Sequence, residues 1–545
     1  MSKLQKKSLS SAAAIVMSSV VVSRITGFIR EMLIPTKFGV SEIGDMYNIA
    51  FLVPDLMYSL LIGGAVSAAL IPILSGYLGR NEEEEGWRAV NTFINVIFIA
   101  SVLACLAGIV FTPQLIKLVS SGYNWSIESN QMELVVKLTR TLFPSVAFLM
   151  LAGLCNGVLN SYNRFAAAAF GPSVYNLLSA ASIYFLSNND IEDNYGVEKV
   201  VVGVMLSALA YFLFQMLFAI KNLRNYRPVI LLKHSGFRRL FSLAIPSMLS
   251  SSVAQINLII SSRFATFFDE GSVTALRMAD RTWQMPLGII AQGMGVAILP
   301  TLSAEYARGE VSEYKSTLMK GLKTVLFLSI PSAVGILVLN KPIVRTIFRF
   351  SENVSEADVS LTGNILTFFT IALVFQSMTT ILNRCFYAIN DTKTPLYLGT
   401  CTIMINVILS TLFINYTDIG VAGMALAYSL SATVNALALL IILDKKAKRL
   451  NLSNFLHFIT KIFLCSTIMG IILLVADNII GKSINIYGIN LSHKLLQLFS
   501  LIIEVGIGGL VYFLATILLK VEEAINVYRT IINKIRNINI LGAKQ

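Results

Sequence analysis

The chain has 545 residues, of which 55% are hydrophobic and 13% charged, with a mean hydropathy of +0.71. A soluble domain carries about 25% charged residues, so this composition excludes an ordinary soluble protein and indicates a polytopic helical membrane protein. The net charge of +13 does not indicate nucleic-acid binding, because no soluble basic domain is present and cationic cytoplasmic loops account for the excess.

Apolar runs long enough to cross a bilayer recur along the whole chain. About fourteen spans are expected from their length and hydropathy. In chain order they lie near residues 11–35, 45–75, 91–112, 134–159, 166–186, 200–220, 240–267, 273–302, 324–339, 358–389, 395–414, 420–443, 457–477 and 495–519. The outside connections near 113–133, 340–357 and 478–494 are long enough only for short interfacial helices, and the run Glu82–Glu85 is interpreted as a solvated turn.

The distribution of Lys and Arg predicts the orientation. With the N-terminus in the cytoplasm, most cations outside the spans fall on the cytoplasmic side, above all in 221–239 and 445–449. This is the bias that the positive-inside rule requires. Both termini are then expected in the cytoplasm.

Two short patterns occur twice in the same order. Ser23–Phe28 is similar to Ser262–Phe267, and Pro72–Ser75 is similar to Pro300–Ser303. Two six-span halves with the same orientation are therefore predicted. The domains are an N-terminal lobe (1–225), a C-terminal lobe (226–450), and two additional spans with a cytoplasmic tail (451–545).

The first span contains Arg24, Arg30 and Glu31. An arginine near the middle of a membrane costs about 2.5–3.5 kcal/mol on insertion scales, and such residues usually face a bundle interior or a wet cavity. Arg24 and Glu31 share a helix face, whereas Arg30 points about 120° away from Arg24; Gly27 between them is expected to allow a bend, and Pro35 to end or kink the span. We interpret the arginines as a clamp for an anionic head group that Glu31 helps to position. The alternative is a local Arg30–Glu31 pair that only offsets burial.

Two further arginines lie inside later spans. Arg263 in 240–267 is interpreted as lining a cavity, and the alternative is that its side chain extends to the outer interface. Arg384, late in the tenth span, is either a substrate ligand or a cytoplasmic anchor. An arginine-rich interior suits a diphosphate, because the planar guanidinium donates paired hydrogen bonds to phosphate oxygens.

A charged network is predicted in the eighth span. Arg277, Asp280 and Arg281 stand at positions i, i+3 and i+4, so they share one helix face. The network would either hold the two lobes together on the outer side, and break when the cavity opens, or have only a structural role. Asp45, at the start of the second span, is the corresponding gating candidate in the first half.

No catalytic or metal-binding motif emerges. The five cysteines all fall in hydrophobic spans without a CxxC spacing, so neither a zinc site nor a disulfide framework is expected. An enzyme such as a membrane glycosyltransferase would need positioned acidic groups and a substantial outside loop. We therefore expect a protein that is not an enzyme.

Several segments together resemble the MurJ (MviN) family of bacterial lipid II flippases, within the multidrug, oligosaccharidyl-lipid and polysaccharide exporters. The resemblance runs from about residue 10 to 445. The segments that carry it are Ser23–Glu31, Asn163–Phe165 with Gly171-Pro172, Ala279–Arg281, Ile298–Ser303, and Phe386–Ala388 with Asp391–Pro395.

The resemblance implies two lobes around a central V-shaped cavity. It implies a flippase that moves an undecaprenyl-diphosphate-linked peptidoglycan precursor from the inner to the outer leaflet by alternating access. By family likeness Ser23, Arg24, Arg30 and Arg263 line the cavity and bind the diphosphate, while the last two spans form a groove for the lipid tail. Membrane lipids and the cell-wall synthesis machinery are the other expected partners, and a monomer is expected.

The chain departs from the family pattern at several places. Glu31 stands where the family usually has aspartate, and Tyr58, Ser59 and Gly63 replace residues that are often charged. Some members have a sodium site with carboxylates in spans seven and eleven, but 240–267 and 395–414 contain no Asp or Glu. We therefore expect no cofactor and no metal site, and the membrane potential as the driving force.

Two other functions stay open. A flippase for a different lipid-linked glycan would need the same diphosphate site, because teichoic-acid and capsule intermediates share that end. A cation-coupled multidrug exporter would prefer acidic residues in its cavity, which the arginines oppose.

Overall fold

The computed structural model describes residues 3–62, 66–123, 125–126, 129–187, 194–447, 450, 452–484, 491–526 and 528–529. These residues form helices joined by short connections, and no strand occurs among them. The contacts divide the chain into two compact units. The first comprises Met1–Arg277 with Ser351–Val354, and the second comprises Met278–Phe350 with Ser355–Gln545.

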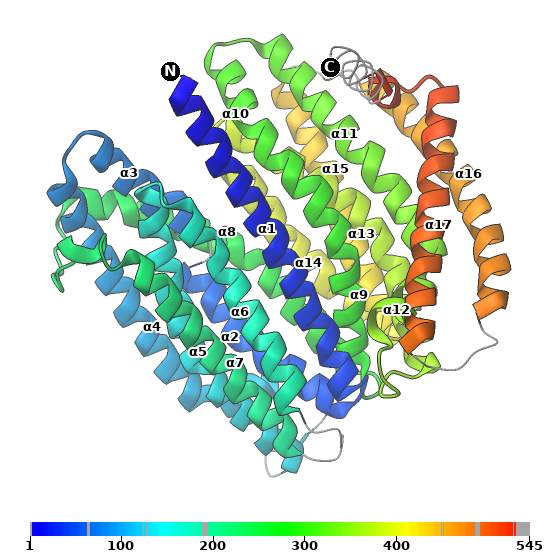
Figure 1. Ribbon diagram of the computed structural model, residues 1–545, viewed down its shortest axis with the longest axis horizontal. Helices are drawn as coiled ribbons and strands as arrows, with labels where there is room; N and C mark the ends of the chain where they lie inside the picture. Colours follow the sequence, from blue (N-terminus) through cyan, green and yellow to red (C-terminus); the bar gives the residue numbers. More distant parts are fainter. Residues whose placement is uncertain are drawn as a thin grey trace, which may run out of the picture. The chain divides into compact units, whose positions relative to one another are not determined.

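The first unit contains the helices up to the start of α9. They are α1 (Lys3–Phe38), α2 (Glu42–Ile62), η1 (Val66–Leu70), α3 (Ile71–Gly79), α4 (Glu83–Val119), α5 (Asn130–Ser161), α6 (Phe165–Leu186), α7 (Asn194–Ala219), η2 (Leu223–Asn225) and α8 (Ser235–Ala265). Helix α5 packs against α2, α4 and α7, while α1 packs along α6 (Figure 1). Trp87, Phe93 and Leu154 lie in its hydrophobic core, against Leu240 of α8.

The second unit is built around α13. Its helices are most of α9 (Ser272–Leu287), η3 (Gly288–Gln292), α10 (Gly293–Ala307), α11 (Val311–Val338), α12 (Asn340–Phe348), α13 (Glu356–Ala388), α14 (Lys393–Tyr416), α15 (Ala422–Lys446), α16 (Leu452–Ile484) and α17 (Leu491–Leu518). Helix α13 packs against α10, α11, α12 and α15, and α16 and α17 pair with each other (Figure 1). Trp283 stacks on Phe369 with ring centroids 5.7 Å apart, which ties α9 to α13.

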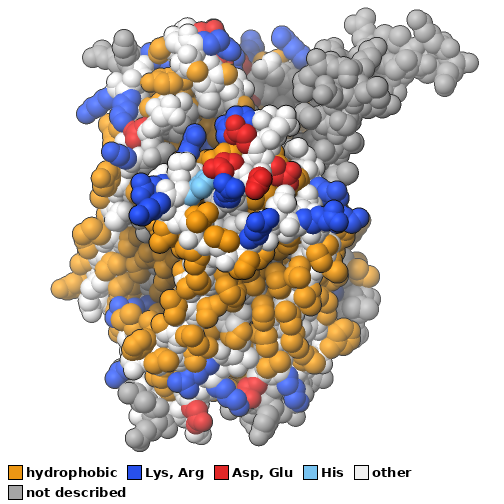
Figure 2. Space-filling model, turned by 90° about the vertical axis from the view of Figure 1, so that its left-hand side faces the viewer, with side chains coloured by type: hydrophobic (Ala, Val, Ile, Leu, Met, Phe, Trp, Pro, Cys, Tyr) orange, Lys and Arg blue, Asp and Glu red, His pale blue; other side chains and the backbone are white. Residues whose placement is uncertain are grey.

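The predicted all-α, multi-span fold is confirmed. Eleven helices within the described residues are long and apolar enough to cross a membrane. They correspond to all the predicted spans except 11–35, 45–75 and 166–186, which are occupied by α1, by α2 with α3, and by α6. The count of fourteen and the division at residues 225 and 450 stay predictions. On the face shown in Figure 2, a broad hydrophobic band lies between two zones of charged side chains, as a bilayer requires.

Some local details differ from the sequence-based expectations. Helix α1 runs without interruption through Gly27 and Pro35 to Phe38, so Pro35 does not end it, and a bend at Gly27 stays a prediction. Glu82, Glu83 and Glu84 are exposed to solvent as predicted, but Glu83, Glu84 and Glu85 form the first turn of α4, where carboxylates are favourable because they lie at a helix N-terminus. The interfacial helix expected near 340–357 is present as α12. Gly63, one of the departures from the family pattern, lies outside the described residues.

The basic connection between α7 and α8 is fastened to α4. The Asn95 amide donates to the carbonyl oxygens of Arg227 (3.4 Å) and Val229 (3.0 Å), and the Leu231 N–H donates to the Thr92 hydroxyl (3.0 Å). Asn91 holds the Asn225 carbonyl at 3.2 Å. These three α4 side chains are buried, so the connection follows a fixed path across the helix.

Candidate functional site

Arg30 and Glu31 of α1 form a local ion pair beside α6. Arg30 Nη2 lies 2.7 Å from Glu31 Oε1, and the two side chains are only 22% and 14% exposed. The Arg30 guanidinium also lies 5.5 Å from the ring centroid of Tyr175 on α6, in cation–π geometry. Tyr175 was not anticipated, since nothing in a single sequence shows which aromatic faces an arginine. Because Glu31 already binds the Arg30 guanidinium, a ligand would have to bind the same guanidinium alongside Glu31.

Ser23 and Arg24 differ in environment from Arg30. The Ser23 carbonyl accepts a hydrogen bond from the Asn176 amide at 3.2 Å, while the Arg24 side chain is exposed. A Cβ at Gly27 would lie 3.1 Å from Asn176 Nδ2, so the glycine permits close packing of α1 on α6 at this level. Of the two predicted clamp residues, Arg24 is therefore the one whose charge is open to an approaching anion.

Arg263 lies in the last turn of α8, against the connection that follows α4. Its Nε donates to the Ser121 hydroxyl at 3.0 Å, and the Gly122 N–H donates to the Thr266 hydroxyl at 3.0 Å. A Cβ at Gly122 would lie 2.4 Å from the Thr266 backbone, so only glycine allows this approach. The structure thus positions Arg263 by Ser121, a partner that the sequence did not reveal.

Asp45 is completely buried and holds the N-terminus of α9. It accepts hydrogen bonds from the Thr274 N–H and hydroxyl, both at 2.7 Å, from the Gly271 N–H at 2.8 Å, and from the Tyr123 hydroxyl. A carboxylate in this position satisfies the free N–H groups of the first helical turn and interacts favourably with the helix dipole. Asp45 therefore fixes α2 and the start of α9 to each other.

Arg277 joins the same cluster through Asn48. Its Nε lies 3.4 Å from Asn48 Oδ1, and the Asn48 amide donates to the Thr274 hydroxyl at 3.1 Å. The structure thus brings together Asp45 and Arg277, two of the predicted gating residues, by way of Thr274 and Asn48. The spacing of Arg277 and Asp280 within one helix could not show this link, because the link joins residues that are more than 200 positions apart in the sequence.

The remaining predicted residues belong to the second unit. Asp280 accepts hydrogen bonds from Trp283 Nε1 (3.1 Å) and Gln284 Nε2 (2.7 Å), while Arg281, the next residue, is half-buried. Arg384 on α13 lies against α10, with its Nε 3.5 Å from the position of a Cβ at Gly295. Whether these groups contact a substrate stays a prediction.

An apolar groove of about 470 Å³ runs along α16 and α17 within the second unit. Pro331 and Gly335 of α11, Ile343 and Ile347 of α12, and Tyr512 of α17 line it. The other lining residues are Thr282, Met285, Pro286, Leu328, Ser332, Ile336, Leu339, Met469, Leu473, Leu501, Val505, Gly508 and Gly509. Such a surface suits a hydrocarbon chain. Among the described residues, no group of three or more His, Cys, Asp or Glu side chains could hold a metal ion.

The fold is that of a membrane transporter. A structure described as an inward-facing multidrug resistance MATE family transporter of the MOP superfamily superposes with a TM-score of 0.64, at 16% identity, over 79% of this chain and 98% of that one. The chain belongs to the lipid II flippase MurJ family, whose sequence model matches residues 34–492.

Individual relatives cover most of the chain. The lipid II flippase MurJ of Burkholderia cenocepacia is 30% identical over 429 residues, 78% of this chain and 82% of the relative. The probable lipid II flippase MurJ of Rickettsia prowazekii is 31% identical over 510 residues, 92% and 96% of the two chains. A structure of the lipid II flippase MurJ in an inward closed conformation has a TM-score of 0.75 and 26% identity, and covers 93% of this chain and 99% of that one. The predicted family is confirmed.

Proposed function

We propose that this protein translocates lipid II, the undecaprenyl-diphosphate-linked peptidoglycan precursor, from the inner to the outer leaflet of the bacterial plasma membrane. The observation that carries the proposal is the likeness over almost the whole chain to relatives named as lipid II flippases. The buried and half-buried arginines of the helices supply the charge that a diphosphate needs.

The head group binds to arginines held in place by neighbouring polar residues. Arg24 offers an exposed guanidinium, Arg30 shares its charge between Glu31 and the ligand, and Arg263 is oriented by Ser121. Ser23 and Arg384 complete the set as further ligands. Arginine is suited to this task because its planar fork matches a pair of phosphate oxygens.

The polyprenyl tail stays in hydrocarbon surroundings throughout. The groove along α16 and α17 offers it an apolar surface, while the remainder of the tail lies in the bilayer. Only the polar head then crosses the membrane through protein, in an alternating-access cycle. Asp45, Arg277, Asp280 and Arg281 control the outer side of that cycle.

The transport step needs no catalytic residue and no cofactor. The membrane potential drives it, since moving one elementary charge across 100 mV is worth about 2.3 kcal/mol. The protein acts as a monomer with both termini in the cytoplasm, in contact with membrane lipids and close to the cell-wall synthesis machinery.

The test is complementation in cells depleted of their own lipid II flippase. We expect the wild-type chain to restore growth, and we expect Arg24→Ala, Arg30→Ala and Arg263→Ala to fail although they reach the membrane. Arg308→Ala is the control, because Arg308 lies between two helices in an exposed pair with Glu310, 2.8 Å away.

The lipid-linked intermediate that accumulates in the depleted cells identifies the substrate. Lipid II should build up in the inner leaflet of depleted cells carrying Arg24→Ala. Build-up of a different lipid-linked glycan would assign the chain to that substrate instead. Drug resistance on overexpression, without any effect on cell-wall precursors, would favour a multidrug exporter.

A further inference from the structure

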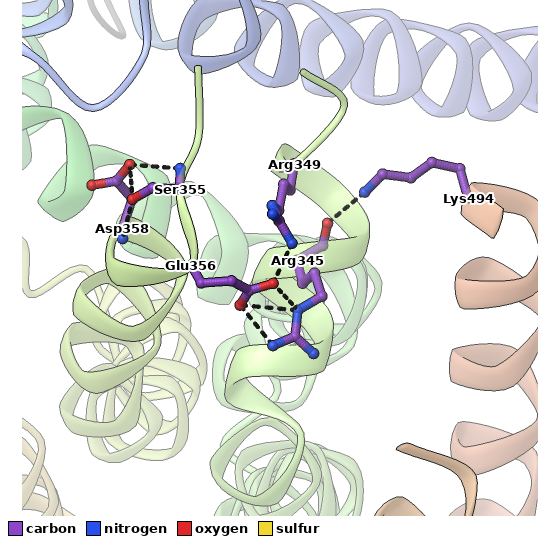
Figure 3. A network of polar contacts seen from close by, with 6 residues as sticks. All are labelled: Arg345, Arg349, Ser355, Glu356, Asp358 and Lys494. Atoms are coloured by element: carbon purple, nitrogen blue, oxygen red, sulfur yellow. Dashed lines mark hydrogen bonds and ion pairs between the residues drawn. The ribbon is translucent and has the colours of Figure 1, made fainter. Parts of the chain in front are cut away.

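Three cations lie close together near the end of α12: Arg345 and Arg349 bind the Glu356 carboxylate, and Lys494 reaches the backbone carbonyl of Arg345 (Figure 3). Arg345 binds Glu356 through one edge of its guanidinium, with Nε 3.0 Å from Oε1 and Nη2 2.7 Å from Oε2, and Arg349 forms a second ion pair with the same carboxylate. Lys494, in the first turn of α17, donates to the Arg345 carbonyl at 2.8 Å and lies 4.9 Å from the centre of the Phe350 ring. The proposed head-group site uses none of these residues.

The cations of this cluster are partly open to a ligand. Asp477 of α16 is electrostatically coupled to Arg345, and Arg345, Arg349 and Glu356 are coupled to Lys494. Arg345 and Arg349 are 29% and 21% exposed, which leaves their charges within reach of a ligand. Lys494 has three N–H donors, of which one has an assigned partner in the described part of the chain.

The cluster adjoins the apolar groove on two helices. Ile343 and Ile347 of α12 line the groove, and the helix ends shortly after them, at Phe348, next to Arg349. On α17, Leu501 lines the groove two helical turns after Lys494, about 10 Å along the helix axis. An amphiphile with an anionic head and a long apolar chain matches both parts at once.

We propose that this combined surface binds an anionic glycerophospholipid, with its phosphodiester among Arg345, Arg349 and Lys494 and one acyl chain in the groove. One phosphodiester carries one negative charge, which is attracted to these three cations. Guanidinium and ammonium groups bind phosphate oxygens through charge-assisted hydrogen bonds. The phospholipid occupies the groove when no polyprenyl tail is there, so the inference does not depend on the substrate proposed above.

The experiment measures lipid selectivity of the full-length chain by native mass spectrometry. The protein is released from mixed nanodiscs that contain equal amounts of phosphatidylglycerol and phosphatidylcholine with the same acyl chains. We expect the wild type to retain phosphatidylglycerol about tenfold or more in excess, because each cation near a membrane surface contributes appreciably to anionic-lipid binding.

The test variant is Arg349→Gln with Lys494→Gln, which keeps the Arg345–Glu356 pair intact. We expect it to retain the two lipids equally. The matched control is Lys341→Gln with Lys199→Gln, which removes two exposed cations from α12 and α7 and should keep the selectivity. The charge-conserving variant Arg349→Lys with Lys494→Arg should keep it too, and this checks that loss of binding is not loss of folding.

The acyl-chain part has its own variant. Gly335 and Gly509 line the groove, and a Cβ at either position would meet no atom within 4 Å. Gly335→Leu with Gly509→Leu should therefore fill the groove without a backbone clash and reduce the bound phosphatidylglycerol.

Four outcomes would overturn the proposal. They are equal retention of both lipids by the wild type, unchanged selectivity in the Gln variant, displacement of the lipid by millimolar inorganic phosphate, and unchanged binding after the groove is filled. Preferential retention of undecaprenyl diphosphate over phosphatidylglycerol would also overturn it, since the site would then belong to the transported lipid.

Discussion

The carboxylate of Asp45 illustrates how a single buried acid organises the first unit. Its two oxygens accept hydrogen bonds from two backbone N–H groups and two hydroxyls. A buried donor that loses its acceptor keeps the full cost of desolvation, about 1–3 kcal/mol for each group. The residue is therefore a structural requirement as well as a gating candidate.

We expect Asp45→Asn to lower the melting temperature of the detergent-solubilised protein. The amide NH₂ would face donors in place of one carboxylate oxygen, so at least one buried donor is left unsatisfied, at a cost of about 1–3 kcal/mol. Asp418→Asn, at an exposed position between α14 and α15, is the control. An unchanged melting temperature for Asp45→Asn would show that Asp45 does not support α9.

Gly122 offers a test of how Arg263 is positioned. Its added Cβ would collide with the Thr266 backbone at 2.4 Å, which forces the connection after α4 away from α8 and moves Ser121 away from Arg263. We expect Gly122→Ala to destabilise the protein by about 1–3 kcal/mol, as overpacking does, and to reduce complementation. Gly79→Ala should have neither effect, because a Cβ there meets nothing within 4 Å.

At the scale of elements, the two π-helical segments are a shared feature of the two halves. η1 separates α2 from α3, and η3 separates α9 from α10. Each precedes one of the two similar motifs, Pro72–Ser75 or Pro300–Ser303. Such segments interrupt the regular hydrogen bonding of a helix and often occur at functional positions. The internal similarity in the sequence thus extends to a similarity in backbone irregularity.

A charged contact joins α14 to α15. Asp391 accepts a hydrogen bond from the Thr394 N–H at 3.0 Å, and Lys446 forms an ion pair with the same carboxylate. Although burial raises the pKa of Asp391, the hydrogen bonds from Lys446 and Thr394 outweigh it and lower the pKa to about 2. A carboxyl group with a lowered pKa stabilises the folded state above its unfolded value near 4.

The contribution of Asp391 should therefore be constant above about pH 5 and decline as the pH falls from about 4 toward 2. The measurement is the difference in melting temperature between the wild type and Asp391→Asn at each pH, which removes the effect of the other carboxylates. A difference that grows on acidification would contradict this assignment.

At the scale of the whole molecule, the driving force can be separated from substrate binding. If one net charge moves with each cycle, a potential of 100 mV is worth about 2.3 kcal/mol, or nearly 50-fold in the ratio of outside to inside substrate. We expect proteoliposomes clamped at zero potential with potassium and valinomycin to lose this accumulation. Full accumulation driven by a sodium gradient at zero potential would instead show sodium coupling.

The sequence predicted the helices well but gave little information about which residues contact one another. Apolar runs predicted the membrane helices, because hydrophobic length is a local property. The close packing of Gly27 on Asn176 of α6 was missed, since one sequence does not show which helix a glycine faces. Tyr123, Thr274 and Ser121 carry no unusual signal in the sequence. Their roles depend on contacts between distant segments, which one sequence cannot reveal.

The fixed path of the connection between α7 and α8 has a consequence for how the chain tolerates change. Its backbone is hydrogen-bonded to Asn91, Thr92 and Asn95 at successive points, so both its length and its path are fixed. Inserting a few glycines and serines into a flexible linker has little effect. The same insertion after Val229 would shift the register of these hydrogen bonds. We therefore expect this exposed, cation-rich connection to tolerate far fewer insertions than its surface position suggests.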